Sequence, residues 1–169
     1  FTNVDQCELE KEKANNINVY GVCNLLKLVK KKTYFIQIST DYVFDGNKGD
    51  YKEDDPTYPE TYYGKTKLEA ENIIRGSNRP WLILRPNVIF GNNLISESSF
   101  VAWVYNNLMK QIKINVVIDQ INNPTWTTAF AQAIRHCIIM NARGIYHYGS
   151  DDKISRFDFA TLIADTFGF

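Results

Sequence analysis

The sequence predicts an α/β fold built on a largely parallel sheet. Short apolar segments rich in β-branched and aromatic residues alternate with longer segments whose apolar residues recur every three or four positions. The first pattern is typical of buried parallel strands, and the second is typical of helices that cover a sheet. A chain of 169 residues is also long enough to bury one substantial core.

The first predicted elements are a helix, a buried strand and a second helix. Helical spacing of apolar residues covers residues 4–32, and we expect the lysines at 30–32 to end this helix at the negative end of its dipole. Residues 34–38, YFIQI, are predicted to form a buried strand. A loop with acids, glycines and prolines follows over residues 45–59. The next helix should begin near residues 59–61 and end at Arg75, before Gly76.

The second half continues the alternation of strands and helices. WLILR at 81–85 predicts a second buried strand, and residues 87–98 predict a loop. Ser155 is placed to cap a final helix that ends at Phe167. Between these we expect a helix over 100–110, a strand over 114–118, a helix over 125–140 and a strand over 144–148.

Charge and cysteine content exclude several classes of protein. Nineteen basic residues balance nineteen acidic ones, so no net field attracts nucleic acid or an anionic membrane. Three cysteines, far apart and without a C-x-x-C pattern, predict neither a disulfide framework nor a zinc site. There is no apolar run near the roughly 20 residues of a membrane span and no signal-peptide pattern. We therefore predict a cytoplasmic protein without a structural metal.

A cluster of tyrosines and lysines lies in the segment TYYGKTK. On a helix, Tyr63 can meet Lys67, but Tyr62 can also meet Lys65, so the spacing alone does not choose a working pair. Parallel sheets bind ligands at the carboxyl ends of their strands. That rule points to the two loops STDYVFDG and RPNVIFG, which directly follow the first two predicted strands.

Tyr63, Lys67 and Thr40 have the chemistry for hydride transfer to a ketone. A tyrosine with a pKa near 10 becomes a better acid-base catalyst when an ammonium, or the ring of an oxidised nicotinamide, favours its phenolate. Thr40, at a strand end, could hydrogen-bond a substrate carbonyl, while Gly64 could leave room for a cofactor. Tyr-x-x-x-Lys also arises by chance in helices, so the residues alone leave a merely structural role open.

Six blocks of sequence occur in a characteristic order along the chain. They are FTNVDQCE, ISTDYVFDG, YGKTKLEAE, ILRPNVIFG, DQINNPTWT and GIYH. In this order they resemble the dTDP-4-dehydrorhamnose reductase family of the extended short-chain dehydrogenase/reductase superfamily. STDYVFDG followed by YGKTK is the specific part of the resemblance. It implies a Rossmann-like doubly wound parallel sheet with substrate-side segments at about 91–130 and 150–169.

The resemblance also implies an activity and its residues. NADPH or NADH would deliver hydride to C4 of dTDP-4-dehydro-L-rhamnose, giving dTDP-L-rhamnose in nucleotide-sugar biosynthesis. Tyr63 would donate the proton, Lys67 would hold the nicotinamide ribose and lower the tyrosine's pKa, and Thr40 would polarise the keto oxygen. The implied cofactor-binding residues are Thr2, Tyr63, Lys67 and Pro86, and the implied substrate-binding residues are Thr2, Val4, Thr40, Asp41 and Asn87.

Other positions carry weaker expectations. Asn18 matches a helix asparagine that supports the superfamily's lysine through water, although a helix-surface amide is an equal interpretation. We expect structural roles for Arg85 and His147. Val88 stands where the reductases often have an aromatic residue near the sugar, which weakens the rhamnosyl assignment more than the reductase chemistry. Mg²⁺ and a homodimer are compatible with the family, but no residue pattern here indicates either.

The family's glycine-rich turn, which binds pyrophosphate at a helix N-terminus, is absent from these residues. None of the nine glycines forms G-x-G-x-x-G after a predicted strand. We therefore expect an internal fragment that lacks the N-terminal glycine-rich strands and the C-terminal end, with the adenine site outside it.

Two other classes of protein contain the same motifs. The regulatory β subunit of methionine adenosyltransferase has very similar SDYVFDG and YGKTK blocks, which makes a non-catalytic regulatory subunit an alternative. An extended-family sugar-nucleotide epimerase or dehydratase would keep Thr40, Tyr63 and Lys67 but need other acids and bases. Thr40 in place of serine, together with the DQ and PTWT segments, favours the reductase.

Overall fold

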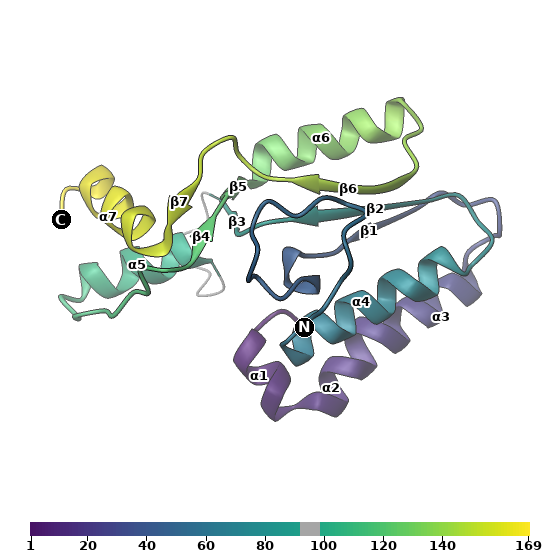
Figure 1. Cartoon of the computed structure of the whole chain (residues 1–169), viewed down its shortest axis with the longest axis horizontal. Coiled ribbons are helices and arrows are strands. Elements are labelled where there is room, and N and C mark those ends of the chain that lie inside the picture. The colour runs from purple at the N-terminus through teal and green to yellow at the C-terminus, as the bar shows by residue number, and fades with distance from the viewer. Residues whose placement is uncertain (92–98) are drawn as a thin grey trace. The chain divides into compact units, whose positions relative to one another are not determined.

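The computed structural model describes residues 1–91 and 99–169 and shows a mixed α/β protein that contains a parallel pair of strands (Figure 1). The helices are α1 Val4–Leu9, α2 Lys11–Asn15, η1 Asn16–Tyr20 (a π-helix), α3 Gly21–Leu28, η2 Asp41–Val43 (a 3₁₀-helix), α4 Tyr62–Arg75, α5 Phe100–Met109, α6 Thr127–Ile139 and α7 Arg156–Phe167. The strands are β1 Phe35–Ile38, β2 Trp81–Pro86, β3 Ile89–Phe90, β4 Ile121–Asn122, β5 Thr125–Trp126, β6 Gly144–Tyr148 and β7 Ile154–Ser155.

The chain forms two compact units, of which the first comprises residues 1–86 and 141–147. Its sheet has the order β1-β2-β6, and β1 runs parallel to β2 with Ile38 opposite Leu84. The Ser39 amide donates to the Leu84 carbonyl over 2.7 Å, which extends this pairing by one residue. The carboxyl ends of both strands therefore meet at one edge of the sheet.

The core of this unit lies between the sheet and the helices α3 and α4, which run together along it in Figure 1. Ile83 of β2 packs in one cluster with Ala70 and Ile74 of α4 and with Val22 and Leu26 of α3. The other predicted elements of this unit formed close to their expected bounds. In particular, Thr61 caps α4 by accepting a hydrogen bond from the Gly64 amide over 3.1 Å, and Gly76 follows the last helical residue.

The prediction of one helix over residues 4–32 is wrong. Glu10 leaves the helical region, with φ −115° and ψ 54°, and separates α1 from α2. Val29 is extended, so the helix ends at Leu28 and the three lysines follow it. The cation at this helix end is instead Arg79, whose Nη2 donates to the Leu26 carbonyl over 2.7 Å.

The second unit comprises residues 87–140 and 148–169, apart from the undescribed segment 92–98. Helices α5 and α7 pack through a core of Val101, Val104, Phe159, Ala160 and Ile163. β3 pairs in parallel with β5, and β4 pairs antiparallel with β7. Ser155 caps α7 as predicted, accepting from the Asp158 amide over 2.9 Å.

The strand predicted over residues 114–118 does not form. Ile114 and Val116 pack against the core of α5 and α7, which accounts for their apolar side chains, but the backbone there is in no strand. Pairing begins only at Ile121. Among the helices of the described ranges, none has both the length and the apolarity that a membrane crossing needs.

Candidate functional site

Tyr63 is buried at the start of α4, with 9% of its surface exposed. It packs in a cluster with Cys7 and Ala14, and its ring meets that of Tyr42 edge-on at 5.8 Å between centroids. Burial raises the pKa of Tyr63 to about 12, against the lowering effect of its hydrogen bond with Thr40. The expected lowering of this pKa is therefore outweighed by burial, and the phenol is neutral at pH 7.

Thr40 is buried at the end of β1 and caps the short helix η2. The Tyr42 amide donates to its Oγ1 over 3.2 Å, and the same oxygen lies 3.1 Å from Oδ1 of Asp41. These contacts hold the Thr40 hydroxyl beside Tyr63. The negative charge of Asp41 raises the pKa of Tyr63 further.

Lys67 lies one helical turn after Tyr63, on the same face of α4. Its Nζ donates to the Ile38 carbonyl over 2.6 Å, at the end of β1. Burial lowers the pKa of Lys67, and the carboxylate of Glu71 opposes that effect. An ammonium carries three N–H donors, so the contact with Ile38 leaves donors for a ligand's hydroxyl groups.

Gly64 allows α4 to approach η2 closely. A Cβ at this position would lie 2.2 Å from the Tyr42 carbonyl oxygen and 3.1 Å from Cβ of Pro59. The contact visible in the structure is therefore with backbone, whereas the sequence had suggested room for a cofactor. Without this glycine, Tyr63 could not sit beside Thr40 in the observed geometry.

The remaining predicted residues lie in or beside several different elements. Val4 packs against the cluster that contains Tyr63, whereas Thr2 is exposed just before α1. Pro86 ends β2 two residues after Leu84, at the same edge of the sheet as the end of β1. Asn87 begins the second unit. Its amide donates to the Tyr148 carbonyl over 3.2 Å, and its buried Oδ1 has no hydrogen-bond partner among the described residues.

A buried carboxylate that the sequence did not predict lies beside these residues. Glu71 is fully buried and accepts from Arg85 twice, from Nη2 at 2.7 Å and from Nε at 3.0 Å. The hydroxyl of Ser39 donates to the same carboxylate over 2.5 Å. Two signals could have found it, because Glu71 continues the four-residue spacing of Tyr63 and Lys67, and Ser39 directly precedes Thr40.

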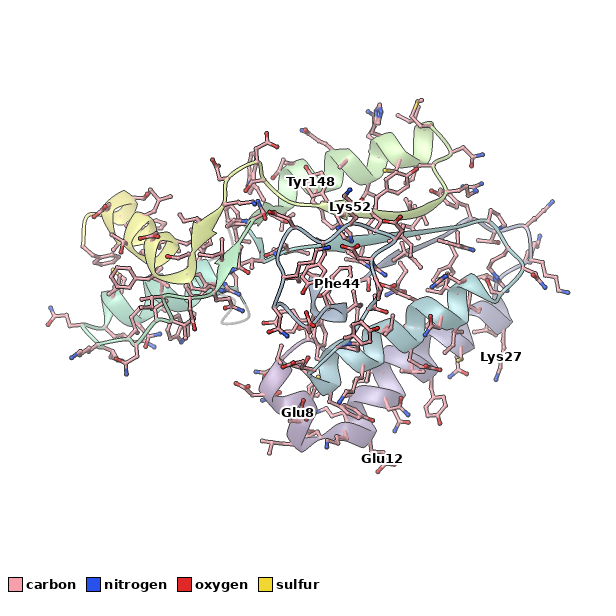
Figure 2. All side chains as sticks on the ribbon, viewed as in Figure 1. Glu8, Glu12, Lys27, Phe44, Lys52 and Tyr148 are labelled. Carbon is pink, nitrogen blue, oxygen red and sulfur yellow. The ribbon has the colours of Figure 1, made fainter. Side chains whose placement is uncertain are left out.

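Arg85 and His147 also hold the loop that follows η2. The Arg85 guanidinium lies 5.2 Å from the centre of the Phe44 ring, which stacks on Tyr51 at 4.4 Å and is labelled in Figure 2. Nδ1 of His147 is 3.1 Å from the Tyr51 carbonyl, and its backbone amide donates to Oε1 of Glu53 over 2.8 Å. These contacts agree with the structural roles expected for Arg85 and His147.

Asn18 lies in the π-helix η1, and π-turns often occur near functional sites. Its Nδ2 donates to the Thr66 hydroxyl over 3.0 Å and to the Phe1 carbonyl over 2.9 Å. Asn18 thus contacts the residue before Lys67. Its expected water link to Lys67 stays a prediction.

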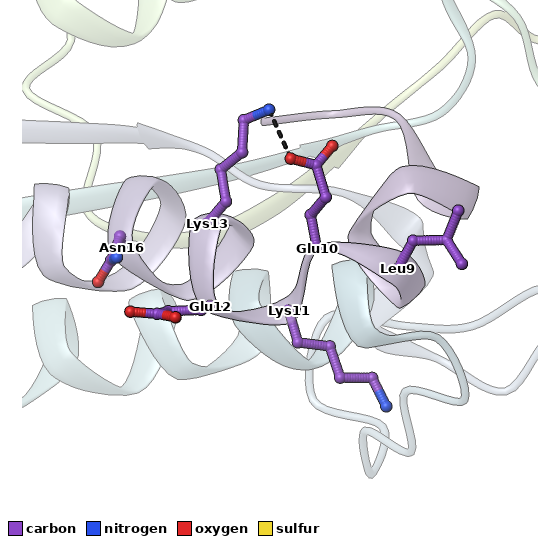
Figure 3. A pocket seen from close by; sticks show the side chains of 6 residues that line it. All are labelled: Leu9, Glu10, Lys11, Glu12, Lys13 and Asn16. Carbon is purple, nitrogen blue, oxygen red and sulfur yellow. Dashed lines mark hydrogen bonds and ion pairs between the residues drawn. The ribbon is translucent and has the colours of Figure 1, made fainter.

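An open hollow of about 450 Å³ lies at α1 and α2 (Figure 3). It is lined by Leu9, Glu10, Lys11, Glu12, Lys13 and Asn16, and Lys13 is paired with Glu10 at 2.8 Å. None of the predicted site residues lines it. Within residues 1–91 and 99–169, no three His, Cys, Asp or Glu side chains are grouped to hold a metal ion.

A parallel sheet whose strand end carries Thr40, beside a helix that carries Tyr63 and Lys67, defines an extended short-chain dehydrogenase/reductase. The comparison with protein families is more specific. Residues 1–169 match the model of the RmlD substrate binding domain, and the chain belongs to that family.

Individual relatives are similar along the whole chain. The spore coat polysaccharide biosynthesis protein SpsK of Bacillus subtilis is 37% identical over 99% of this chain and 59% of its own length. A dTDP-4-dehydrorhamnose reductase of Aggregatibacter actinomycetemcomitans is 36% identical over 98% of this chain and 58% of the relative. The methionine adenosyltransferase 2 subunit beta of Danio rerio is 32% identical over 96% of this chain and 52% of the relative.

A solved structure shows the same similarity in three dimensions. The dTDP-4-dehydrorhamnose reductase of Bacillus anthracis, in complex with NADP, has a TM-score of 0.90 at 29% identity, covering 100% of this chain and 60% of that one. The chain thus spans a little over half the length of the curated relatives that it matches.

Proposed function

We propose that the protein is an NAD(P)H-dependent reductase that converts dTDP-4-dehydro-L-rhamnose into dTDP-L-rhamnose, on a Rossmann-like doubly wound sheet. The observation that carries the proposal is the hydrogen bond between buried Tyr63 and Thr40, with Lys67 one turn further along α4. Relatives of 29–36% identity that are named dTDP-4-dehydrorhamnose reductases support the choice of substrate.

The chemistry assigns one task to each side chain. Thr40 hydrogen-bonds the C4 keto oxygen and polarises the carbonyl, and Tyr63 gives its proton to that oxygen as it becomes a hydroxyl. Lys67 stabilises the resulting phenolate, since a nearby cation favours the charged form. A reduced nicotinamide bound here would supply the hydride to C4, and the products would be an alcohol and an oxidised nicotinamide.

The nicotinamide half of such a cofactor fits the residues present. Lys67 contacts Ile38 and has further N–H donors for the ribose hydroxyls. Tyr63 lies one helical turn from Lys67, and we assign Thr2 and Pro86 to the same half of the cofactor. Val4, Asp41 and Asn87 are assigned to the sugar nucleotide, and the unpartnered Oδ1 of Asn87 is an acceptor for one of its hydroxyl groups.

The test is turnover by the full-length protein with NADPH or NADH and dTDP-4-keto-6-deoxy-L-mannose, beside two variants. Tyr63→Phe should lower kcat by at least roughly 100-fold, the usual worth of a general acid, and still bind the cofactor. Tyr62→Phe is the matched control, because the neighbouring tyrosine is only partly buried, and should turn over like wild type. Equal turnover by all three proteins would contradict the assignment of Tyr63.

A non-catalytic regulatory subunit is the second candidate, favoured by the 32% identity with the Danio rerio methionine adenosyltransferase subunit. It predicts no turnover by wild type or Tyr63→Phe, and tight binding of a methionine adenosyltransferase catalytic subunit. Isothermal titration with that subunit separates the two functions.

A further inference from the structure

We propose that Glu71 is a positioning residue for Thr40, Tyr63 and Lys67: through Ser39 its carboxylate holds the segment after β1 that carries Thr40, and its negative charge stabilises the Lys67 ammonium one turn away. The catalytic consequence of this role rests on the proposed reductase function. The electrostatic part does not, and it can be measured without turnover.

Three residues on one face of α4 contact three consecutive residues at and just after the end of β1. Along α4, residues 63, 67 and 71 follow one another at one-turn spacing and share a face. Tyr63 meets Thr40, Lys67 donates to the Ile38 carbonyl over 2.6 Å, and Glu71 accepts from Ser39 over 2.5 Å. The helix is thus attached to three consecutive residues at the end of β1, and Glu71 provides one of the attachments.

The Glu71 carboxylate is able to act as a rigid anchor because all sides of it are occupied. Its side chain is 0% exposed, and that of its partner Arg85 is 2% exposed. Arg85 binds it with two parallel N–H groups from the neighbouring strand β2, a geometry that fixes the orientation of both side chains. Ser39 then has one direction in which its hydroxyl can donate, and this restricts the backbone of the next residue, Thr40.

Charges around Lys67 come from several elements. Glu71 and Tyr63 share the α4 face with it, and Arg85 of β2 is linked to it through Glu71. Asp41, from η2, acts on Tyr63. Of the groups that act on Lys67, Glu71 is the one that raises its pKa, against the lowering by burial. Removing that negative charge leaves the lowering of the Lys67 pKa by burial unopposed.

The experiment separates the charge of Glu71 from its hydrogen bond. Glu71→Gln keeps the shape and removes the charge, and NMR of protein labelled with ¹³C-lysine follows Lys67, assigned with Lys67→Arg. We expect the Lys67 titration, and the alkaline limb of the kcat/KM profile, to move to lower pH. Ser39→Ala keeps every charge, so it should lower kcat several-fold without moving the titration. Ser77→Ala is the control: it removes the hydrogen bond from the Ser77 hydroxyl to the Ile74 carbonyl near the C-terminal end of α4, and it should change neither the Lys67 titration nor kcat.

The outcomes distinguish this proposal from the proposed function. An unchanged Lys67 titration in a folded Glu71→Gln protein would overturn it, whatever the activity. If Glu71→Gln does not fold, Ser39→Ala decides, and a wild-type kcat in that variant would overturn it too. A shifted titration in a protein that never reduces the sugar nucleotide supports the link between Glu71 and Lys67 and refutes the reductase.

Discussion

Gly64→Ala should destabilise the first unit, although alanine is the better helix former. The added Cβ would lie 2.2 Å from the Tyr42 carbonyl oxygen, whereas ordinary contact begins at 3.4 Å. The start of α4 must therefore move by roughly 1 Å away from η2, against a packed backbone rather than a flexible side chain. Overpacking costs about 1–3 kcal/mol, and helix propensity returns up to about 1 kcal/mol. The expected net loss is about 1–2 kcal/mol.

Urea unfolding measures this loss, and hydrogen exchange of peptides from residues 62–75 locates it in α4. The matched control is Gly21→Ala, since Gly21 is also helical and a Cβ there would meet the Asn16 carbonyl oxygen at 3.8 Å, an ordinary contact. That variant should be unchanged or more stable by up to about 1 kcal/mol. If Gly64→Ala is as stable as Gly21→Ala, the approach of α4 to η2 does not depend on a glycine, and the reasoning fails.

Three further predictions concern single groups of the first unit. Arg85→Ala leaves Glu71 charged and buried without its partner, so it should lower the free energy of unfolding by about 3–5 kcal/mol in a urea titration. The control Lys13→Ala breaks a half-exposed ion pair and should lower it by less than about 1 kcal/mol in the same titration. Thr61→Ala removes the N-cap of α4 and should cost about 0.5–2 kcal/mol; an unchanged urea midpoint would exclude the cap. Burial lowers the pKa of His147 below its ordinary 6.5, so the unfolded chain binds more protons there, and wild type should lose stability as pH falls below 6.5. Comparing unfolding of wild type and His147→Gln from pH 7.5 downwards checks this, because the variant should lack that component.

Local signals in the sequence correctly predicted the helices whose ends carry capping residues. Thr61 and Gly76 frame α4, and Ser155 caps α7, so each helix was placed to within about two residues. Two errors fall where apolar residues carried the prediction. The helix over residues 4–32 is interrupted at Glu10, and residues 114–118 form no strand. Periodicity reports which side chains are buried, and it does not report hydrogen bonding of the backbone.

The sequence by itself predicted the chemical parts of the proposed site. Tyr63 and Lys67 are four residues apart on a helix, and Thr40 closely follows a strand, and these facts need no knowledge of distant contacts. Tertiary structure alone decided how the parts are held and charged. The partners of Glu71 are 14 and 32 residues away in sequence, and burial, which raises the pKa of Tyr63 and lowers that of Lys67, exists only once the sheet and helices pack. Desolvation depends on everything that surrounds a group, so residue spacing cannot predict it.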